Sequence, residues 1–317
     1  MGRLEDLSTF TRVIEARSLS GAARRLGSTK SAVSKQVNRL EEQLGTRLLH
    51  RTTRSVSPTD DGRKVYERAT RILEEAQTLE AEVAGGLAQP SGTLRLSTST
   101  AFGNTQLTAL MARFCAKYPQ LHVVLGLNDR YVDLAEEGFD VVLRLTATPS
   151  PGLVARRLAP VRYRLCATPA HLAAHGHPAT LQDLARHPCL TFGYLHTPTQ
   201  WHFRHAVDGR EETVDVATAL QFESGLTANS SEALRIAALA HMGLAILPTY
   251  AAGDDIRAGR LVSLLDDWQP VGRPADADTL YAVYLPSRFP SPKVRALIDF
   301  LLEELGEVPP WDRPGTS

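Results

Sequence analysis

Residues 18–44 have the sequence SLSGAARRLGSTKSAVSKQVNRLEEQL, and this stretch decides the fold of the N-terminal part of the 317-residue chain. It predicts two helices joined by a tight turn at Gly27, because glycine suits the left-handed residue that ends a helix. In the second helix, apolar residues recur at steps of four, three and four, so they share one face that must be buried. They are Val33, Val37, Leu40 and Leu44.

The opposite face of the second helix carries small polar side chains, a pattern that purely structural helices also show. With successive residues about 100° apart, Ser31, Lys35 and Asn38 point away from the apolar stripe. A side chain that reaches a base edge needs a polar tip on a helix slim enough for the major groove, which is about 12 Å wide. The pattern therefore predicts a DNA-reading helix. Its expected DNA-contacting residues are Thr29, Lys30, Ser31, Ser34, Lys35 and Asn38.

The segment TRLLHRTTRSVSPT at residues 46–59 is short and β-compatible. Arg47, Arg51 and Arg54 lie around a Thr-Thr tip, so we interpret the segment as a wing whose arginines contact phosphates or enter the minor groove. An arginine-rich exposed hairpin without a partner is the alternative. Arg51 and Arg54 complete the set of predicted DNA contacts.

Positive charge is concentrated at the N-terminal end of the chain. Residues 1–58 hold 11 Lys and Arg against 5 Asp and Glu, whereas the whole chain has 35 of each kind. A basic module on a mildly acidic body suits one part that binds a polyanion and another part with a different task. Taken alone, a solvated basic face explains the charge equally well.

A long helix is expected at residues 59–83, with a hinge after it in the segment GGLAQPSG at residues 85–92. Its apolar residues follow a heptad pattern, and we expect the same helix of a second subunit to cover them. Packing against the chain's own body is the alternative. A helix of about 25 residues spans roughly 37 Å, enough to hold two winged modules about one DNA turn or more apart. The expected dimer contacts are Val65, Ala69, Ile72, Ala76, Leu79 and Val83.

Residues 10–62 resemble the LysR-type transcriptional regulators of bacteria almost position by position. The shared positions are Ala22, Ala23, Leu26, Ser34, Leu40, Glu41, Leu44, Gly45, Arg51, Arg54, Thr59 and Gly62. Leu49 and Pro58 depart from the family pattern, and neither lies on the reading face. The resemblance implies base contacts from Lys30, Ser31, Ser34 and Lys35 and wing contacts from Arg51 and Arg54. Lys35 stands where Arg is frequent, which keeps the charge but loses bidentate bonding to guanine.

Beyond the hinge, strands and helices alternate, which favours an α/β sheet. The C-terminal strand and helix complete the first block, so we expect lobe 1 from residues 91–161 plus 265–305 and lobe 2 from residues 162–264. The phrases VDLAEEGFDVVLRL and ALRIAALAHMGLAILP resemble LysR-type effector domains, which are built like periplasmic binding proteins. The expected fold is α+β overall. It consists of a winged helix-turn-helix domain at 1–58, a linker helix and hinge at 59–90, and a two-lobed α/β effector-binding domain at 91–317.

Polar residues gather where strands of the predicted effector domain end, the place where ligands bind in open α/β sheets. Ser99 and Thr100 begin a helix there, and the free backbone N–H groups of a helix start favour an anion. We therefore hypothesise a small carboxylate or similar anion as effector. For each single residue, helix capping is the alternative. The expected effector contacts are Ser99, Thr100, Asn128, Arg144 and Asn229, with Ser230 beside the last.

Catalysis, a cofactor and a metal find no support in the sequence. The G-x-S-x-G, P-loop, G-x-G-x-x-G and HExxH patterns are absent, so we do not expect an enzyme. His171, His175 and His177 have a spacing that could hold a metal, but they lie at an expected helix end, where exposed histidines are ordinary. Three further histidines flank Trp201 in a region expected to be irregular, namely His196, His202 and His205.

Three cysteines, Cys115, Cys166 and Cys189, form no CxxC pair, which favours buried thiols. Oxidation sensing through Cys166 and Cys189 is the alternative.

The expected function is a sequence-specific DNA-binding transcription regulator controlled by a small-molecule effector. Its expected partners are double-stranded promoter DNA, the effector and a second copy of the chain, with a homotetramer and a contact with RNA polymerase as further predictions. The start MGRLEDLSTF has no apolar h-region, and uninterrupted runs of about 18 apolar residues are absent, so we expect no membrane and a cytoplasmic location. The rival hypothesis is an α/β binding protein or enzyme whose N-terminal helices only mediate association. The effector, the target genes and the choice between dimer and tetramer stay open.

Overall fold

The computed structural model describes residues 2–51, 56–83, 89–130, 132–145, 152–193, 199–216, 225–271, 278–287 and 291–313. The chain consists of two compact units, Met1–Gln89 and Pro90–Ser317, and each is described by itself. Of the helices in these ranges, none combines the length and the apolar character that a membrane crossing requires.

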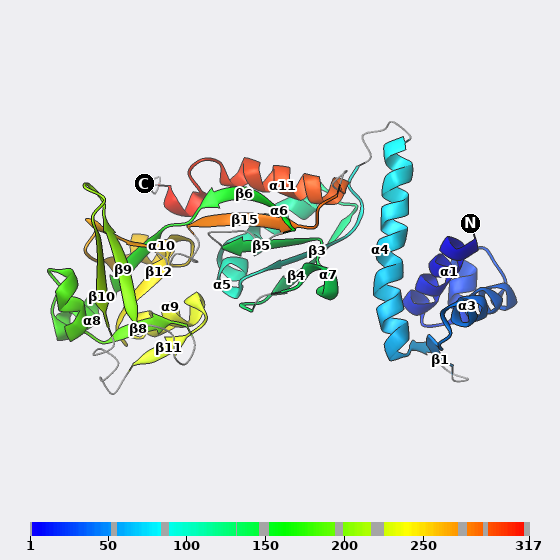
Figure 1. The fold of residues 1–317 in the computed structure, drawn as a ribbon, viewed down its shortest axis with the longest axis horizontal. Coiled ribbons are helices and arrows are strands. Elements are labelled where there is room, and N and C mark those ends of the chain that lie inside the picture. Colours follow the sequence, from blue (N-terminus) through cyan, green and yellow to red (C-terminus); the bar gives the residue numbers. More distant parts are fainter. Residues whose placement is uncertain are drawn as a thin grey trace. The chain divides into compact units, whose positions relative to one another are not determined.

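The first unit is a three-helix module followed by a small antiparallel hairpin and a long helix (Figure 1). Its elements are α1 (Gly2–Ala16), α2 (Leu19–Arg25), α3 (Lys30–Leu44), β1 (Leu49–Arg51), β2 (Val56–Pro58) and α4 (Asp60–Val83). Ser18 caps α2, because its hydroxyl accepts the Gly21 N–H at 3.2 Å. Gly27 has a φ of +60° after this helix, as a left-handed turn residue requires. The predicted helix pair, wing and linker helix are confirmed.

The core of the first unit is formed by the apolar faces of its first three helices and by the base of the hairpin. Its buried residues are Phe10, Val13, Ala22, Ala23, Val33, Val37, Leu40, Leu48 and Leu49. Three of the four residues on the predicted apolar face of α3 belong to it. The fourth, Leu44, is exposed because it is the last residue of α3, before the chain turns at Gly45.

The second unit contains a five-stranded sheet in the order β4-β3-β5-β15-β6. The strands are β3 (Gly92–Thr98), β4 (Leu121–Leu127), β5 (Val141–Leu145), β6 (Val154–Pro160) and β15 (Thr279–Tyr284). One face packs against helices that share a large core with it (Figure 1). They are α5 (Thr100–Phe102), the π-helical turn η1 (Gly103–Leu107), α6 (Thr108–Lys117) and α11 (Pro292–Leu305). The short helix α7 (Leu134–Glu137) packs with the other face.

A second five-stranded sheet has the order β11-β8-β12-β7-β13. Its strands are β7 (Tyr163–Ala167), β8 (Cys189–Phe192), β11 (Leu226–Ala228), β12 (Leu244–Pro248) and β13 (Val262–Ser263). Helices α9 (Ser231–Leu239) and α10 (Thr249–Arg257) share a core with one face. The other face is covered by α8 (Pro169–His175), the 3-10 helix η2 (Leu181–Arg186) and a three-stranded sheet.

This three-stranded sheet has the order β10-β9-β14 and consists of β9 (Gln200–His205), β10 (Glu211–Asp215) and β14 (Trp268–Val271). The expectation that the region around Trp201 is irregular was therefore wrong. Trp201 and Phe203 alternate with more exposed polar residues and are buried in the core. That alternation is the signature of a half-buried strand, and it was present in the sequence.

The chain passes between the two five-stranded sheets twice, and the two passages are hydrogen-bonded to each other. The N–H of Val161, between β6 and β7, donates to the carbonyl of Asp278, just before β15, at 2.7 Å. Nearby, the Thr249 N–H at the start of α10 donates to the Arg162 carbonyl at 2.8 Å. The short 3-10 helix η4 (Pro310–Asp312) contacts α10 near the C-terminal end.

Candidate DNA-reading face and effector site

The face of α3 opposite the core is open to solvent. Thr29 is the N-cap of the helix, since its hydroxyl accepts the Ala32 N–H at 3.2 Å. Of the other residues predicted to read DNA, Ser34 is half-buried. The remaining four are exposed, namely Lys30, Ser31, Lys35 and Asn38. The six residues therefore lie at the start and along one side of α3.

Polar contacts hold α3 against α1. The buried carboxylate of Asp6 accepts the Arg39 Nε–H at 2.7 Å and a second hydrogen bond from the same guanidinium. Hydrogen bonding to Asp6 raises the pKa of Arg39. The Thr9 hydroxyl donates to the side-chain oxygen of Gln36 at 3.0 Å. These contacts fix how α3 is rotated about its axis, and so which residues face outward.

The hairpin β1–β2 forms the predicted wing, with Leu49 opposite Pro58 and Arg51 opposite Val56. The carboxylate of Glu41 at the end of α3 accepts the N–H groups of Leu48 and Leu49, at 2.9 and 3.1 Å. The backbone of Arg51 lies in β1, whereas its side chain and the whole of Arg54 lie outside the described residues.

The apolar stripe of α4 faces different surroundings along its length. Val65 packs against the core of the winged module and Ala69 is buried, so this end contacts the chain's own body. Ile72 is 48% exposed. Ala76 is half-buried, and the side chains of Leu79 and Val83 lie outside the described residues. The part of the stripe that a second copy could cover therefore begins at Ile72.

Two of the predicted effector residues meet at one edge of the first sheet. Thr98 lies opposite Leu127 in the parallel ladder of β3 and β4. Ser99 and Asn128 follow these paired residues directly, so they emerge side by side at the carboxyl ends of the strands. This is the edge at which α/β proteins bind ligands.

Arg144 joins this edge from the strand on the other side. In the parallel ladder of β3 and β5, Val142 lies opposite Ser97, which puts Arg144 level with Ser99. The Arg144 guanidinium donates to the Arg130 carbonyl at 3.0 Å, so it is already bound to the loop that follows β4.

Two hydroxyls near this edge are buried: that of Ser97 has no hydrogen-bond partner among the described residues, and that of Ser99 faces the phenol of Tyr250. Ser99 is the N-cap residue of α5, yet its side chain makes no capping hydrogen bond, so capping does not account for it. The Thr100 N–H donates to the carboxylate of Asp129 at 2.9 Å. An anionic ligand at this N–H group must therefore replace a carboxylate that the protein itself supplies.

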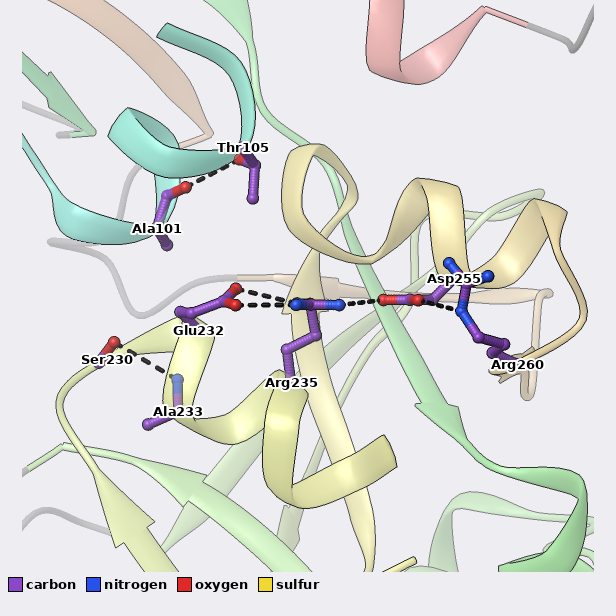
Figure 2. Close-up of polar contacts among 8 residues, drawn as sticks. All are labelled: Ala101, Thr105, Ser230, Glu232, Ala233, Arg235, Asp255 and Arg260. Atoms are coloured by element: carbon purple, nitrogen blue, oxygen red, sulfur yellow. Dashed lines mark hydrogen bonds and ion pairs between the residues drawn. The ribbon is translucent and has the colours of Figure 1, made fainter. Parts of the chain in front are cut away.

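Asn229 lies near the second sheet, just before Ser230. Ser230 caps α9, and its hydroxyl accepts the Ala233 N–H at 3.5 Å, so here capping does describe the residue. Helix α9 contacts α5, and Figure 2 shows Ala101 and Thr105 of the α5–η1 turn near the first turn of α9. The starts of two helices from different sheets thus approach each other.

Tyr250 lies between these helix starts, and no sequence pattern singled it out. Its buried ring meets Phe102 edge-on, with centroids 5.3 Å apart, and the Gln106 amide donates to its carbonyl at 2.9 Å. Its hydroxyl faces Ser99 and Ser231, and burial raises the pKa of the phenol. The hydroxyl therefore stays protonated and able to donate a hydrogen bond.

An ion-pair network holds α9 against α10 behind this site (Figure 2). Arg235 donates to both carboxylate oxygens of Glu232, at 2.8 and 2.9 Å, and to Asp255 at 2.5 Å. Arg260 donates to the other oxygen of Asp255 at 2.6 Å. Hydrogen bonding to Glu232 is the main reason that the pKa of Arg235 is raised.

His175 and His177 are exposed at the end of α8 and just after it, as expected, but His171 is not. His171 is buried, and its Nδ1–H donates to the His241 carbonyl at 3.1 Å. Its ring stacks on that of His175, with centroids 4.3 Å apart. In the part of the chain that the structure describes, no group of three His, Cys, Asp or Glu is arranged to hold a metal ion.

The second five-stranded sheet does not allow oxidation sensing through a disulfide between Cys166 and Cys189. Cys166 lies on β7 and Cys189 on β8, with β12 between these strands, and the two side chains belong to cores on opposite faces. Burial raises the pKa of both thiols to about 12. The pair therefore cannot join without unfolding of the sheet, and neither thiol is activated.

Two family descriptions match this chain. Residues 4–63 match the bacterial regulatory helix-turn-helix proteins of the lysR family, and residues 87–306 match the LysR substrate binding domain. The chain belongs to the LysR family of transcription regulators. As a LysR-type regulator it binds DNA and carries a domain for a small-molecule effector.

Full-length relatives agree with this assignment. The regulator is 36% identical over 300 residues to the probable HTH-type transcriptional regulator LtrA of Klebsiella pneumoniae, covering 95% of this chain and 94% of that protein. The structure of CrgA, a LysR-type transcriptional regulator from Neisseria meningitidis, is similar with a TM-score of 0.59 at 34% identity, covering 96% of this chain and 99% of that one.

The full-length structure of the Vibrio cholerae virulence activator AphB shares the fold, with a TM-score of 0.57 at 24% identity, covering 95% of this chain and 98% of that one. These relatives are transcription regulators, so the rival hypothesis of an α/β enzyme was wrong.

Proposed function

We propose that this LysR-type regulator reads a specific DNA sequence with α3 and its wing, and that a small carboxylate controls it by binding at the starts of α5 and α9. The observation that carries the first half is the exposed polar face of α3, opposite three buried residues of the same helix. Lys30 and Lys35 add positive charge to this face. A polar, basic face on a rigidly held helix is what base reading in the major groove requires.

The reading face is tested by removing Lys35 and Arg51 together, as Lys35→Ala with Arg51→Ala. The probe is a duplex that the wild-type protein selects from a randomised library. We expect affinity to fall about 100-fold or more, since each base or phosphate contact contributes about 1–3 kcal/mol. The slope of log affinity against log salt should become shallower by about one or two units.

The matched control is Arg113→Ala with Lys117→Ala, which removes two positive charges from the second unit, where they pair with Glu304 and Glu303. Its affinity should stay within about twofold of wild type, because surface ion pairs of this kind contribute little. Equal binding by wild type and the Lys35/Arg51 variant would refute the assigned reading face.

The effector half of the proposal rests on the buried Ser99 hydroxyl, which begins α5 without capping it and faces the Tyr250 phenol, and on the unpartnered Ser97 hydroxyl nearby. A carboxylate oxygen could accept hydrogen bonds from these hydroxyls and from the Tyr250 phenol. It would also replace the carboxylate of Asp129 on the Thr100 N–H. Binding controls the protein if the ligand favours one arrangement of α5 and α9 over another, since only such differential affinity shifts an equilibrium.

Thermal unfolding of the full-length protein tests the effector. The three tryptophans, Trp201, Trp268 and Trp311, all lie in the second unit, so their fluorescence reports this unit. We expect at least one of acetate, malonate, succinate and benzoate to raise the midpoint, while the corresponding neutral amides do not. A ligand at about 100 times its Kd stabilises by about 2.7 kcal/mol.

Ser99→Ala should abolish the shift. The control is Ser291→Ala, because Ser291 is likewise an N-cap residue without a capping hydrogen bond but begins α11. An equal shift with acids and amides would refute an anion, and no shift with either would refute the site for these ligands.

We further propose that α4 pairs with the α4 of a second copy from Ile72 onward, where its apolar stripe is exposed. Ala76, Leu79 and Val83 continue the heptad spacing in the sequence. Assembly into a tetramer, contact with RNA polymerase and a cytoplasmic location stay predictions.

A further inference from the structure

The backbone of Leu48 is a junction of the reading helix, the wing and the linker helix. Its N–H donates to the carboxylate of Glu41 on α3, and its carbonyl accepts the Thr59 N–H just before α4, both at 2.9 Å. The Thr59 hydroxyl donates to the Arg47 carbonyl at 2.7 Å and accepts the Gly62 N–H at 2.9 Å. All three elements are therefore tied together within a few residues.

Gly62 allows the first turn of α4 to approach this junction closely. A Cβ atom at residue 62 would lie 2.0 Å from the carbonyl oxygen of Leu48 and 2.9 Å from its carbonyl carbon. Both atoms belong to the backbone, so no side-chain rotation can relieve the contact. Gly62 lies inside a helix, where alanine is the better helix former. Gly62 is therefore explained by the close approach of its backbone to that of Leu48, and not by the helical conformation of residue 62.

We propose that the contact between Gly62 and the Leu48 carbonyl sets the angle between the linker helix α4 and the winged module formed by α1 to β2. This angle in turn sets the half-site spacing that a dimer prefers on DNA. The proposal rests on the proposed function, in which two copies pair through α4 and each reads one half-site. It makes Gly62 a positioning residue, which contacts neither base nor phosphate.

The geometry makes the effect large enough to measure. Relieving a 2.0 Å contact requires a shift of about 1 Å at the first turn of α4. Over one helical turn of about 5.4 Å, this shift tilts the helix by about 10°. At the far end of α4, about 36 Å away, the tilt becomes a displacement of about 6 Å, comparable with the rise of roughly two base pairs.

The experiment compares wild type with Gly62→Ala on synthetic duplexes. Half-sites are first selected by each protein from a randomised library, and two copies are then separated by spacers lengthened in single-base-pair steps. We expect Gly62→Ala to select the same half-site, since its reading residues are unchanged, but a different spacing. At the wild-type spacing it should bind about tenfold more weakly, because the DNA must deform to meet displaced winged modules.

Glu67→Ala is the matched control, since Glu67 is exposed on the same helix one turn further along. It should keep the wild-type spacing. A folded Gly62→Ala protein with the wild-type spacing profile overturns the proposal. A loss of affinity that is equal at every spacing also overturns it, because that is the result of a merely structural role.

Thr59→Val provides a second test, which can be carried out even if the Gly62→Ala protein does not fold. It keeps the shape of the side chain and removes both hydrogen bonds of the hydroxyl, so the junction loosens without a clash. We expect a flatter profile, with neighbouring spacings bound nearly as well as the best one. An unchanged profile in this variant overturns the proposal.

The proposed function fails in a different way. If wild type itself selects no half-site from the library, sequence reading is refuted. If wild type selects single half-sites without any preferred spacing, the pairing through α4 is refuted. Either result also overturns the inference about Gly62, because that inference presupposes paired half-sites at a preferred spacing. Where wild type shows such a preference, the spacing profiles of the two variants decide the inference alone.

Discussion

In each unit, a buried aspartate pairs with arginine and holds a helix of a candidate site in place. The surroundings of the two aspartates differ. In the first unit, Asp6 has Arg39 as its ion-pair partner, and the Arg39 side chain is 47% exposed. In the second unit, Asp255 lies between Arg235, which is only 22% exposed, and Arg260, which is 58% exposed. The arginine that holds α3 is partly in water, whereas Arg235, the arginine that α9 itself supplies, is mostly inside the protein.

Apolar packing, in contrast, is more extensive for α3 than for α9. Helix α3 buries Val33, Val37 and Leu40, whereas α9 buries one large residue, Leu234, and two alanines. Each buried methylene contributes about 0.8 kcal/mol, so packing alone holds α3 more strongly than α9. A buried charge that loses its partner is costly. We infer that the core positions α3 and that the ion-pair network positions α9.

The largest expected effect is that of Asp255→Ala. It removes one of the two carboxylates that pair with the mostly buried Arg235 and leaves Glu232 as the other. We therefore expect the second unit to lose about 2–4 kcal/mol of unfolding free energy, less than for a charge left wholly unpaired. Tryptophan fluorescence during urea unfolding of the full-length protein measures it. The control is Asp254→Ala, since Asp254 is 80% exposed and pairs with Arg257 on the surface. That variant should change stability by less than about 1 kcal/mol. Equal losses in the two variants would contradict the positioning role of the network.

A smaller effect is expected for Asp6→Ala. Arg39 can turn to water once its partner is gone, so we expect the first unit to lose about 1–3 kcal/mol. Circular dichroism of helix unfolding and affinity for the selected duplex measure the change. The tryptophan transition should not move, because the first unit contains no tryptophan. Glu5→Ala, at an exposed neighbouring position, is the control. A tryptophan transition displaced by Asp6→Ala would show that the two units do not unfold independently.

The smallest effect is a pH dependence confined to the second unit. Burial lowers the pKa of His171 and of His187, so both are neutral in the fold. The unfolded chain binds protons at these histidines near pH 6.5, where the folded chain does not. Stability is therefore full above about pH 6.5 and falls as the pH decreases through that value. The tryptophan transition between about pH 7 and pH 5 measures it.

His171→Asn should weaken this pH dependence, because an amide N–H can replace Nδ1–H as the donor to the His241 carbonyl but does not titrate. The exposed His122→Asn is the control and should leave the dependence as it is. A steeper loss of stability in acid for His171→Asn than for wild type would refute the assignment.

Local spacing in the sequence predicted much of the first unit. The four-three-four spacing in α3 and the run of apolar residues in α4 are periodic over neighbouring turns, so helices and their buried faces follow from the residues themselves. The wing was predicted from its position after Gly45 and its β-compatible residues. The candidate effector residues Ser99, Asn128 and Arg144 were predicted from a rule about strand ends, and parallel register places them along one edge.

The sequence by itself determined the helices of the winged module and their buried faces, because the apolar spacing in each helix repeats within a few turns. The tertiary structure alone decided the features that join distant residues. Among them are the burial of Tyr250 beside Ser99, the network around Asp255, and the contact between Gly62 and Leu48. The physical reason is that periodicity encodes which face of an element is buried, whereas the partner that covers it is chosen by packing between elements far apart in the chain.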